Sequence, residues 1–186
     1  MPTVVLRPDS TTSQTGWSTS NIHTVIGDNN TGTSATQNNV TCNFEGGLDD
    51  LDGSLSGATI NNFTISLTGL PGRAGASTVA MSLVHATDGE FAAESESFGS
   101  GTTTQTTTAR TTQQDGSSAL TFTYINDCRV KIVPNTQGIT AKELFVTIDY
   151  TAAPSGYAND VIGVETGNIG KVKGVATANI EKVIGV

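Results

Sequence analysis

The chain has little of what catalysis, metal binding or nucleic-acid binding requires. Its 186 residues include two histidines and two cysteines, only 14% are charged, and the net charge is −8. Phosphate binding needs clustered lysine and arginine, so this charge argues against a nucleic-acid partner. Neither His23 nor His85 has a companion at metal-ligand spacing, and no G-x-S-x-G or G-x-x-x-x-G-K-[ST] motif occurs. We therefore expect no enzymatic activity, no cofactor and no metal.

Long apolar runs are also missing. None approaches the ~20 residues that span a bilayer, so we expect no membrane partner. The segment Met1–Asp9 has no basic stretch followed by an apolar one, which predicts that there is no signal peptide and that the chain is made in a cytoplasm. Cys42 and Cys128 are then expected to be buried free thiols. A disulfide between them would need their two strands to be neighbours.

The segment Leu48–Gly53 is the one dense acidic cluster in the sequence. Its D-x-D-G core is similar to a calcium loop, because hard cations prefer carboxylate oxygens on a tightly turning backbone. The full calcium pattern fails, since Leu48 stands at the first ligand position and no glutamate closes the loop. An ordinary solvated turn is the favoured interpretation.

What the chain has in quantity is threonine, serine, asparagine and glycine. Hydrophobic residues make up 35%, below the ~45–50% (a count that includes glycine) of globular chains. The polar residues suit strands with a solvated outer face, joined by glycine and asparagine turns. Disorder, the rival interpretation, normally needs high charge density as well as low hydrophobicity. The composition therefore predicts a folded all-β chain.

Alternation of apolar and polar residues marks short strands along residues 1–153. The cleanest is Leu144–Tyr150, and Ile60 stands out of phase with the alternation that follows it, which predicts a β-bulge. The segment Thr102–Thr112 is either an exposed polar strand or a loop. Eight or nine short strands without a long helix predict an antiparallel β-sandwich of jelly-roll type. The other predicted strands are Thr3–Leu6, Asn21–Ile26, Asn39–Phe44, Phe63–Leu67, Val79–Val84, Leu120–Tyr124 and Arg129–Val133.

The last 26 residues repeat with a period of 11. Val161–Lys171 and Val172–Lys182 share the pattern V-x-G-V-x-T-x-N-I-x-K, identical at 7 of 11 positions, and Val183–Val186 opens a third copy. A helical coil is disfavoured because glycine recurs at the third position. We predict a short strand over V-x-G-V, a turn around T-x-N and a return segment. Such units need stacked neighbours to bury their apolar face.

The repeat predicts a division of the chain into a β-sandwich domain, 1–153, and a linker with an assembly tail, 154–186. The tail is expected to bury apolar side chains against a partner, most simply in a closed trimer of the same chain. The predicted interface residues are Val161, Val164, Ile169, Val172, Val175, Ile180, Val183 and Val186.

Two stretches carry a family resemblance. The tandem N-I-x-K-V-x-G-V units Asn168–Val175 and Asn179–Val186 resemble those of tailed-bacteriophage virion proteins. The opening Val4–Asp9, together with Gly16-Trp17, is similar to the start of jelly-roll modules in phage structural proteins, particularly of marine and cyanobacterial phages. The resemblance implies a non-enzymatic virion protein that binds other virion proteins. We expect a capsid decoration (cement) protein, with a tail- or fibre-associated protein as the alternative.

A carbohydrate-binding β-sandwich module is the rival from another functional class. Four scattered aromatic residues, Trp17, Tyr124, Tyr150 and Tyr157, could form a platform on which sugar rings stack. Aromatic residues make up only 5% of the chain, however, and in a β-sandwich they are usually core. The core interpretation is therefore favoured.

Overall fold

The computed structural model describes residues 1–37, 42–72, 75–135, 138–153, 171–172 and 175–176. The chain divides into two compact units, Met1–Thr151 and Ala152–Val186. Among the described residues, no helix is both long enough and apolar enough to cross a bilayer.

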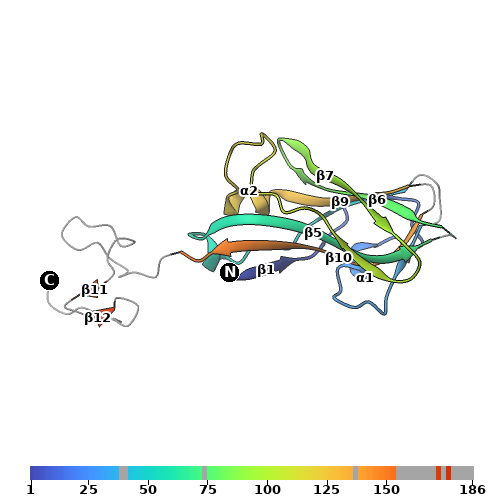
Figure 1. The fold of residues 1–186 in the computed structure, drawn as a ribbon, viewed down its shortest axis with the longest axis horizontal. Coiled ribbons are helices and arrows are strands. Elements are labelled where there is room, and N and C mark those ends of the chain that lie inside the picture. Colours follow the sequence, from blue (N-terminus) through green and yellow to red (C-terminus); the bar gives the residue numbers. More distant parts are fainter. Residues whose placement is uncertain (38–41, 73–74, 136–137, 154–170, 173–174, 177–186) are drawn as a thin grey trace. The chain divides into compact units, whose positions relative to one another are not determined.

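Residues 1–151 form two antiparallel sheets that pack face to face. In Figure 1, strands β6, β7 and β9 of one sheet lie together above β5, β10 and β1 of the other. The first sheet, the β5–β10 sheet, contains β1 (Thr3–Leu6), β10 (Ile139–Thr151), β5 (Thr59–Pro71) and β8 (Thr103–Thr106) in that order, with β3 (Ala35–Thr36) also pairing with β10. The second, the β6–β9 sheet, contains β2 (Ser13–Thr15), β4 (Asn43–Gly47), β9 (Cys128–Pro134), β6 (Ser77–His85) and β7 (Gly89–Phe98). The predicted all-β antiparallel sandwich is confirmed.

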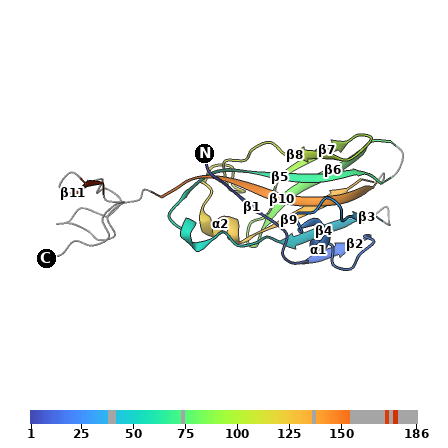
Figure 2. The same cartoon turned by 90° about the horizontal axis from the view of Figure 1, so that it is seen from below.

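The centre of the first sheet is the ladder between β5 and β10. Its register runs from Ile139 opposite Pro71 to Thr151 opposite Thr59, and Figure 2 shows the two strands side by side along the domain. The pairing shifts between Asn62 and Ile60, so the predicted bulge is confirmed. Side chains of both sheets meet in one core, and most of them are completely buried. The largest of these are Phe44, Phe63, Phe98, Leu6, Ile22, Ile26, Ile65, Leu67, Met81, Leu83, Ile125 and Ile132.

Two predicted strands are helical turns instead. Within Asn21–Ile26 lies α1 (His23–Ile26), and within Leu120–Tyr124 begins α2 (Phe122–Asn126). At α1 the buried residues Ile22 and Ile26 are four apart, as on one face of a helix, whereas α2 buries Tyr124 and Ile125. Residues four apart share a face in a helix and also in a strand, so apolar spacing in a segment of five or six residues does not distinguish the two. A third turn is the 3-10 helix η1 (Gly53–Leu55).

Other predictions differ in extent. Strand β4 begins at Asn43, and residues 38–41 lie outside the described residues. Within Thr102–Thr112 only β8 is a strand. Strand β7 was not predicted, because its exposed and half-buried positions carry glutamate, serine and alanine, with buried phenylalanine only at Phe91 and Phe98.

Cys42 and Cys128 are buried free thiols, as expected. On the β4–β9 ladder, Phe44 pairs with Ile132 and Gly47 with Arg129, so the two cysteines lie beyond opposite ends of that ladder. Burial raises the pKa of each thiol to about 12.

These thiols should resist modification in the native protein. A pKa of about 12 leaves about one thiolate in ten thousand at pH 8, and the thiolate is the reactive species. With a chromogenic disulfide reagent at pH 8, we expect no fast labelling of the folded chain and two labels per chain after unfolding in urea. Fast labelling of one thiol without unfolding would contradict the burial described here.

Arg7, the residue after β1, contacts both β10 and the loop between α1 and β3. Its Nη1 lies 2.8 Å from Glu143 Oε1 on β10, and its Nη2 donates a hydrogen bond of 2.8 Å to Asn29 Oδ1. The guanidinium carbon lies 5.4 Å from the centre of the Phe145 ring. Lys142 Nζ donates a hydrogen bond of 2.9 Å to the Thr31 carbonyl, in the loop that also contains Asn29.

The substitution Arg7→Met should lower the free energy of unfolding by about 1–3 kcal/mol, because it leaves the half-buried Glu143 carboxylate without its partner. Lys142→Met is the matched control, since it removes another cation that contacts the same loop, and it should cost less than about 1 kcal/mol. Urea denaturation measures both. Equal losses for the two variants would contradict a central role for Arg7.

Candidate functional site

The structure describes two of the predicted interface residues of the tail. Strands β11 (Lys171–Val172) and β12 (Val175–Ala176) pair antiparallel, with Val172 opposite Val175. For the second copy, Val172–Val175, the prediction that V-x-G-V forms one strand is therefore wrong, because its two valines belong to opposing strands. The first and third copies lie outside the described residues. The other six predicted residues, Val161, Val164, Ile169, Ile180, Val183 and Val186, lie outside the described residues.

Charge is divided unequally between the two units. Residues 1–151 hold 14 of the 17 acidic and six of the nine basic residues, so they carry the whole net charge of −8. Residues 152–186 hold three of each sign and are neutral. Copies of the sandwich should therefore repel one another, and this repulsion does not extend to the tail.

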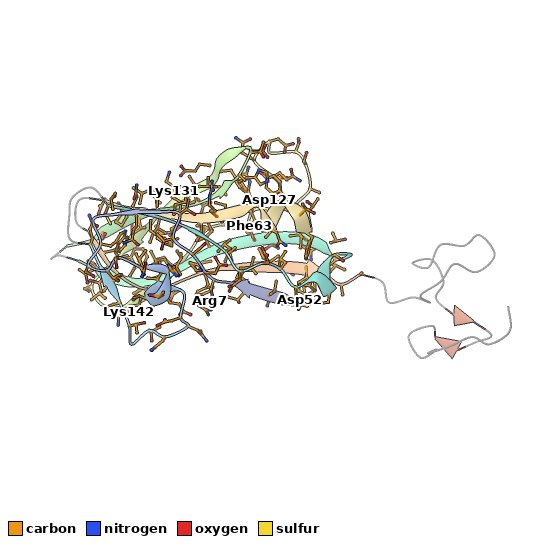
Figure 3. All side chains as sticks on the ribbon, turned by 180° about the vertical axis from the view of Figure 1, so that it is seen from behind. Arg7, Asp52, Phe63, Asp127, Lys131 and Lys142 are labelled. Atoms are coloured by element: carbon orange, nitrogen blue, oxygen red, sulfur yellow. The ribbon has the colours of Figure 1, made fainter. Side chains whose placement is uncertain are left out.

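Much of the acidic charge surrounds α2, at one end of the sandwich (Figure 1). Asp127 caps the C-terminus of this helix, and three loops are hydrogen-bonded to α2 or to Asp127 through the backbone N–H groups of Leu51, Ala86 and Gln114. Figure 3 marks Asp52 and Lys142 toward opposite ends of the domain. The exposed acidic residues of α2 and these loops are Asp49, Asp50, Asp52, Asp88, Asp115 and Asp127.

The acidic segment Leu48–Gly53 forms a turn whose carboxylates serve the backbone. Asp52 accepts a hydrogen bond of 2.7 Å from the Ser54 N–H at the start of η1, and this contact lowers the pKa of Asp52. Asp49 Oδ2 lies 3.3 Å from the Arg7 backbone nitrogen, which donates to it. Among the described residues, no group of acidic, histidine or cysteine side chains could hold a metal ion. The carboxylates of Asp49 and Asp52 therefore accept hydrogen bonds from the backbone, as is usual for turn residues.

Both histidines take part in packing or local hydrogen bonding. The His85 ring is buried and stacks on Tyr124, with 4.0 Å between ring centres and 5° between the planes. Its Nδ1 accepts a hydrogen bond from the Asp88 N–H at 3.2 Å. His23 Nδ1 lies 2.7 Å from Thr11 Oγ1.

The proposed aromatic platform does not form. Trp17 is 8% exposed and donates from Nε1 to the Asn43 carbonyl at 2.7 Å. Tyr124 is 6% exposed, and its hydroxyl accepts a hydrogen bond from the Gln114 N–H. Tyr150 is half-buried against the core, and Tyr157 lies outside the described residues. The core interpretation is confirmed for Trp17 and Tyr124.

A half-buried aromatic residue that was expected on a strand, Phe122, instead lines an open depression of about 390 Å³. This groove lies at the α2 end, between the segment that leads into β5 and the segment that begins α2. No lining side chain is titratable, so the groove itself carries no charge. Its lining residues are Ser56, Gly57, Ala58, Thr59, Leu120, Thr121, Phe122 and Thr123.

Both walls of the groove are fixed by hydrogen bonds. On one side, the Ala58 N–H donates to the Leu55 carbonyl at 2.8 Å. On the other, the Thr121 hydroxyl caps α2 by accepting from the Tyr124 N–H at 3.1 Å. The Leu51 N–H donates to Asn126 Oδ1 at 2.9 Å and ties the acidic turn to α2. The first two bonds order each wall by itself, and the third joins α2 to the turn that precedes the other wall.

The groove also offers free polar groups. Ser56, Thr59 and Thr123 are exposed, and within the described part of the chain their hydroxyls have no hydrogen-bond partner. Local sequence patterns could not reveal this set, because its two walls come from segments far apart in the chain. The groove lining presents one aromatic ring beside neutral hydroxyl and backbone groups, and none of its side chains is a carboxylic acid or an amine base.

No protein-family model matches the chain, and no curated protein matches it. One similar solved structure is the CBM36-1 domain of a multidomain xylanase from the hindgut metagenome of Trinervitermes trinervoides, with 12% identity over 80% of this chain and 97% of that chain, at a TM-score of 0.45. Another is the apo form of BiXyn10A CBM1, with 12% identity over 78% of this chain and 99% of that chain, at a TM-score of 0.31. Similarity at this level says nothing of what this chain binds.

Proposed function

We propose that this chain is a non-enzymatic structural protein that attaches to a larger assembly through its repeat tail. The observation that carries the proposal is the unequal division of charge between sandwich and tail. Acidic sandwiches repel one another, so copies associate through the neutral segment with its regularly spaced valine and isoleucine residues. The antiparallel pairing of Val172 with Val175 supports an ordered repeat.

The assembly that we propose is a virion, and its basis is the resemblance of the N-I-x-K-V-x-G-V units to phage proteins. Capsid decoration is the position that we prefer, with a tail- or fibre-associated position as the alternative. The partners would be the major capsid or tail proteins and two further copies of this chain. Nucleic acid is disfavoured as a partner by the net charge of −8.

Removal of the tail tests this assembly. We expect light scattering to give a trimer for the full chain and a monomer for a chain that ends at Ser155, because the truncation removes the apolar repeats. The sandwich should keep its fold, since its core lies within residues 1–151.

A full-length chain with Val172→Ser and Val175→Ser provides the matched control, because it keeps the length and charge of the tail. It should weaken the trimer as the truncation does. A full chain that is a monomer, or a trimer that survives the truncation, would contradict self-assembly through the tail.

A second candidate is a non-catalytic carbohydrate-binding module, and the uncharged groove at α2 is the observation that favours it. An aromatic ring beside several free hydroxyls suits a sugar, which presents an apolar face and a rim of hydroxyl groups. The two similar solved structures bear the designation CBM in their names, although their low similarity adds no weight. Binding to a glycan array separates this candidate from a purely structural role.

A further inference from the structure

We infer that the groove between residues 56–59 and 120–123 is a binding site for a neutral sugar ring, with Phe122 as its stacking residue. This inference rests on the carbohydrate-binding candidate above and names the ligand class and location for it. Three properties of the groove support it: its size and lining, its available hydroxyls and the charge that surrounds it.

The size and lining fit a sugar better than an extended apolar segment. A volume of about 390 Å³ lies near the lower end of the ~300–1,000 Å³ of small-molecule sites. Phe122 is half-buried, so part of its ring packs on the core and part remains open to a ligand. The C–H face of a pyranose is apolar and covers an aromatic ring well. A second depression, near Leu70, Pro71 and Gly101, has no aromatic side chain in its lining.

The exposed hydroxyl groups of the groove call for a ligand that can both donate and accept hydrogen bonds. Ser56, Thr59 and Thr123 can each donate one hydrogen bond and accept others, and no partner within the described residues uses them. A polyol matches this set, because each of its hydroxyls is also both donor and acceptor. An apolar ligand would leave the three groups without partners once water is displaced.

The surrounding charge selects a neutral sugar over an acidic one. Six exposed aspartates lie on α2 and on the loops hydrogen-bonded to it, and they give this end of the domain a negative potential. The nearby cation Arg129 is paired, since its Nε lies 2.8 Å from Glu45 Oε1. A sulfated sugar or a uronic acid would be repelled, whereas a neutral pyranose would not.

The test is a titration of the full-length protein with neutral disaccharides, namely cellobiose, xylobiose and lactose, followed by amide NMR shifts. We expect at least one of them to shift the amides of Ser56, Gly57, Phe122 and Thr123, and the shifts to saturate. A sulfated disaccharide should produce no such shifts at matched concentration. The same disaccharides on a solid array provide an independent readout of binding.

Two kinds of variant locate the site. Phe122→Ala should weaken binding about tenfold, while Phe122→Tyr keeps the stacking ring and should retain it. Thr59→Val with Thr123→Val removes two exposed hydroxyls at nearly constant volume, and this variant should also weaken binding without loss of fold. Phe145→Ala is the matched control, because Phe145 is another half-buried aromatic residue but does not line the groove.

The outcomes separate the site from the function. If a neutral disaccharide binds but its shifts map elsewhere and Phe122→Ala has no effect, the groove assignment is wrong while carbohydrate binding stands. If no sugar binds in either readout, both the assignment and the carbohydrate-binding candidate fail. Tighter binding of the sulfated sugar than of the neutral ones would overturn the selection by charge.

Discussion

The antiparallel ladder between β5 and β10 is the constraint on which the sandwich depends. Each strand has 13 residues. The pairing runs from Ile139 opposite Pro71 to Thr151 opposite Thr59. β1 and β3 pair with β10, and β8 pairs with β5, so every strand of the first sheet is placed by this pair. The ladder also fixes the inner face, because Phe63, Ile65 and Leu67 all point to the core. A shift of one residue would turn these side chains to solvent, so burial and register enforce each other.

At the α2 end, one wall of the groove is formed by the start of a short helix and not by a strand. Tyr124 and Ile125 anchor the helix in the core, which leaves Phe122 at its first turn only half-buried. The Thr121 hydroxyl caps the start of α2, and the hydrogen bond from the Leu51 N–H to Asn126 Oδ1 ties the acidic turn to the end of α2. A strand over the same residues would have placed Leu120, Phe122 and Tyr124 on one face, and Phe122 would not have lined a groove.

The two proposals concern different parts of the chain and are compatible. In these proposals the acidic sandwich would carry the uncharged groove, whereas the neutral tail would make the apolar contacts. A display protein needs both an attachment segment and an exposed domain, and attachment of several copies would multiply weak binding at each groove. Charge separates these roles, since all of the net −8 lies within residues 1–151.

The sequence by itself determined the all-β class, the strands with clear alternation, the bulge at Ile60, the burial of Trp17 and Tyr124, and the 11-residue repeat. These features depend on patterns within short stretches of sequence. For the strands, the pattern is the alternation of apolar and polar residues with a period of two. Only the tertiary structure decided that Asn21–Ile26 and Leu120–Tyr124 hold helical turns, because spacings of two and four coincide in short segments. It also decided the groove at Phe122, because the two walls come from segments 56–59 and 120–123, and no local pattern records which distant segments will meet. The pairing of Val172 with Val175 is local by contrast, since only two residues separate them.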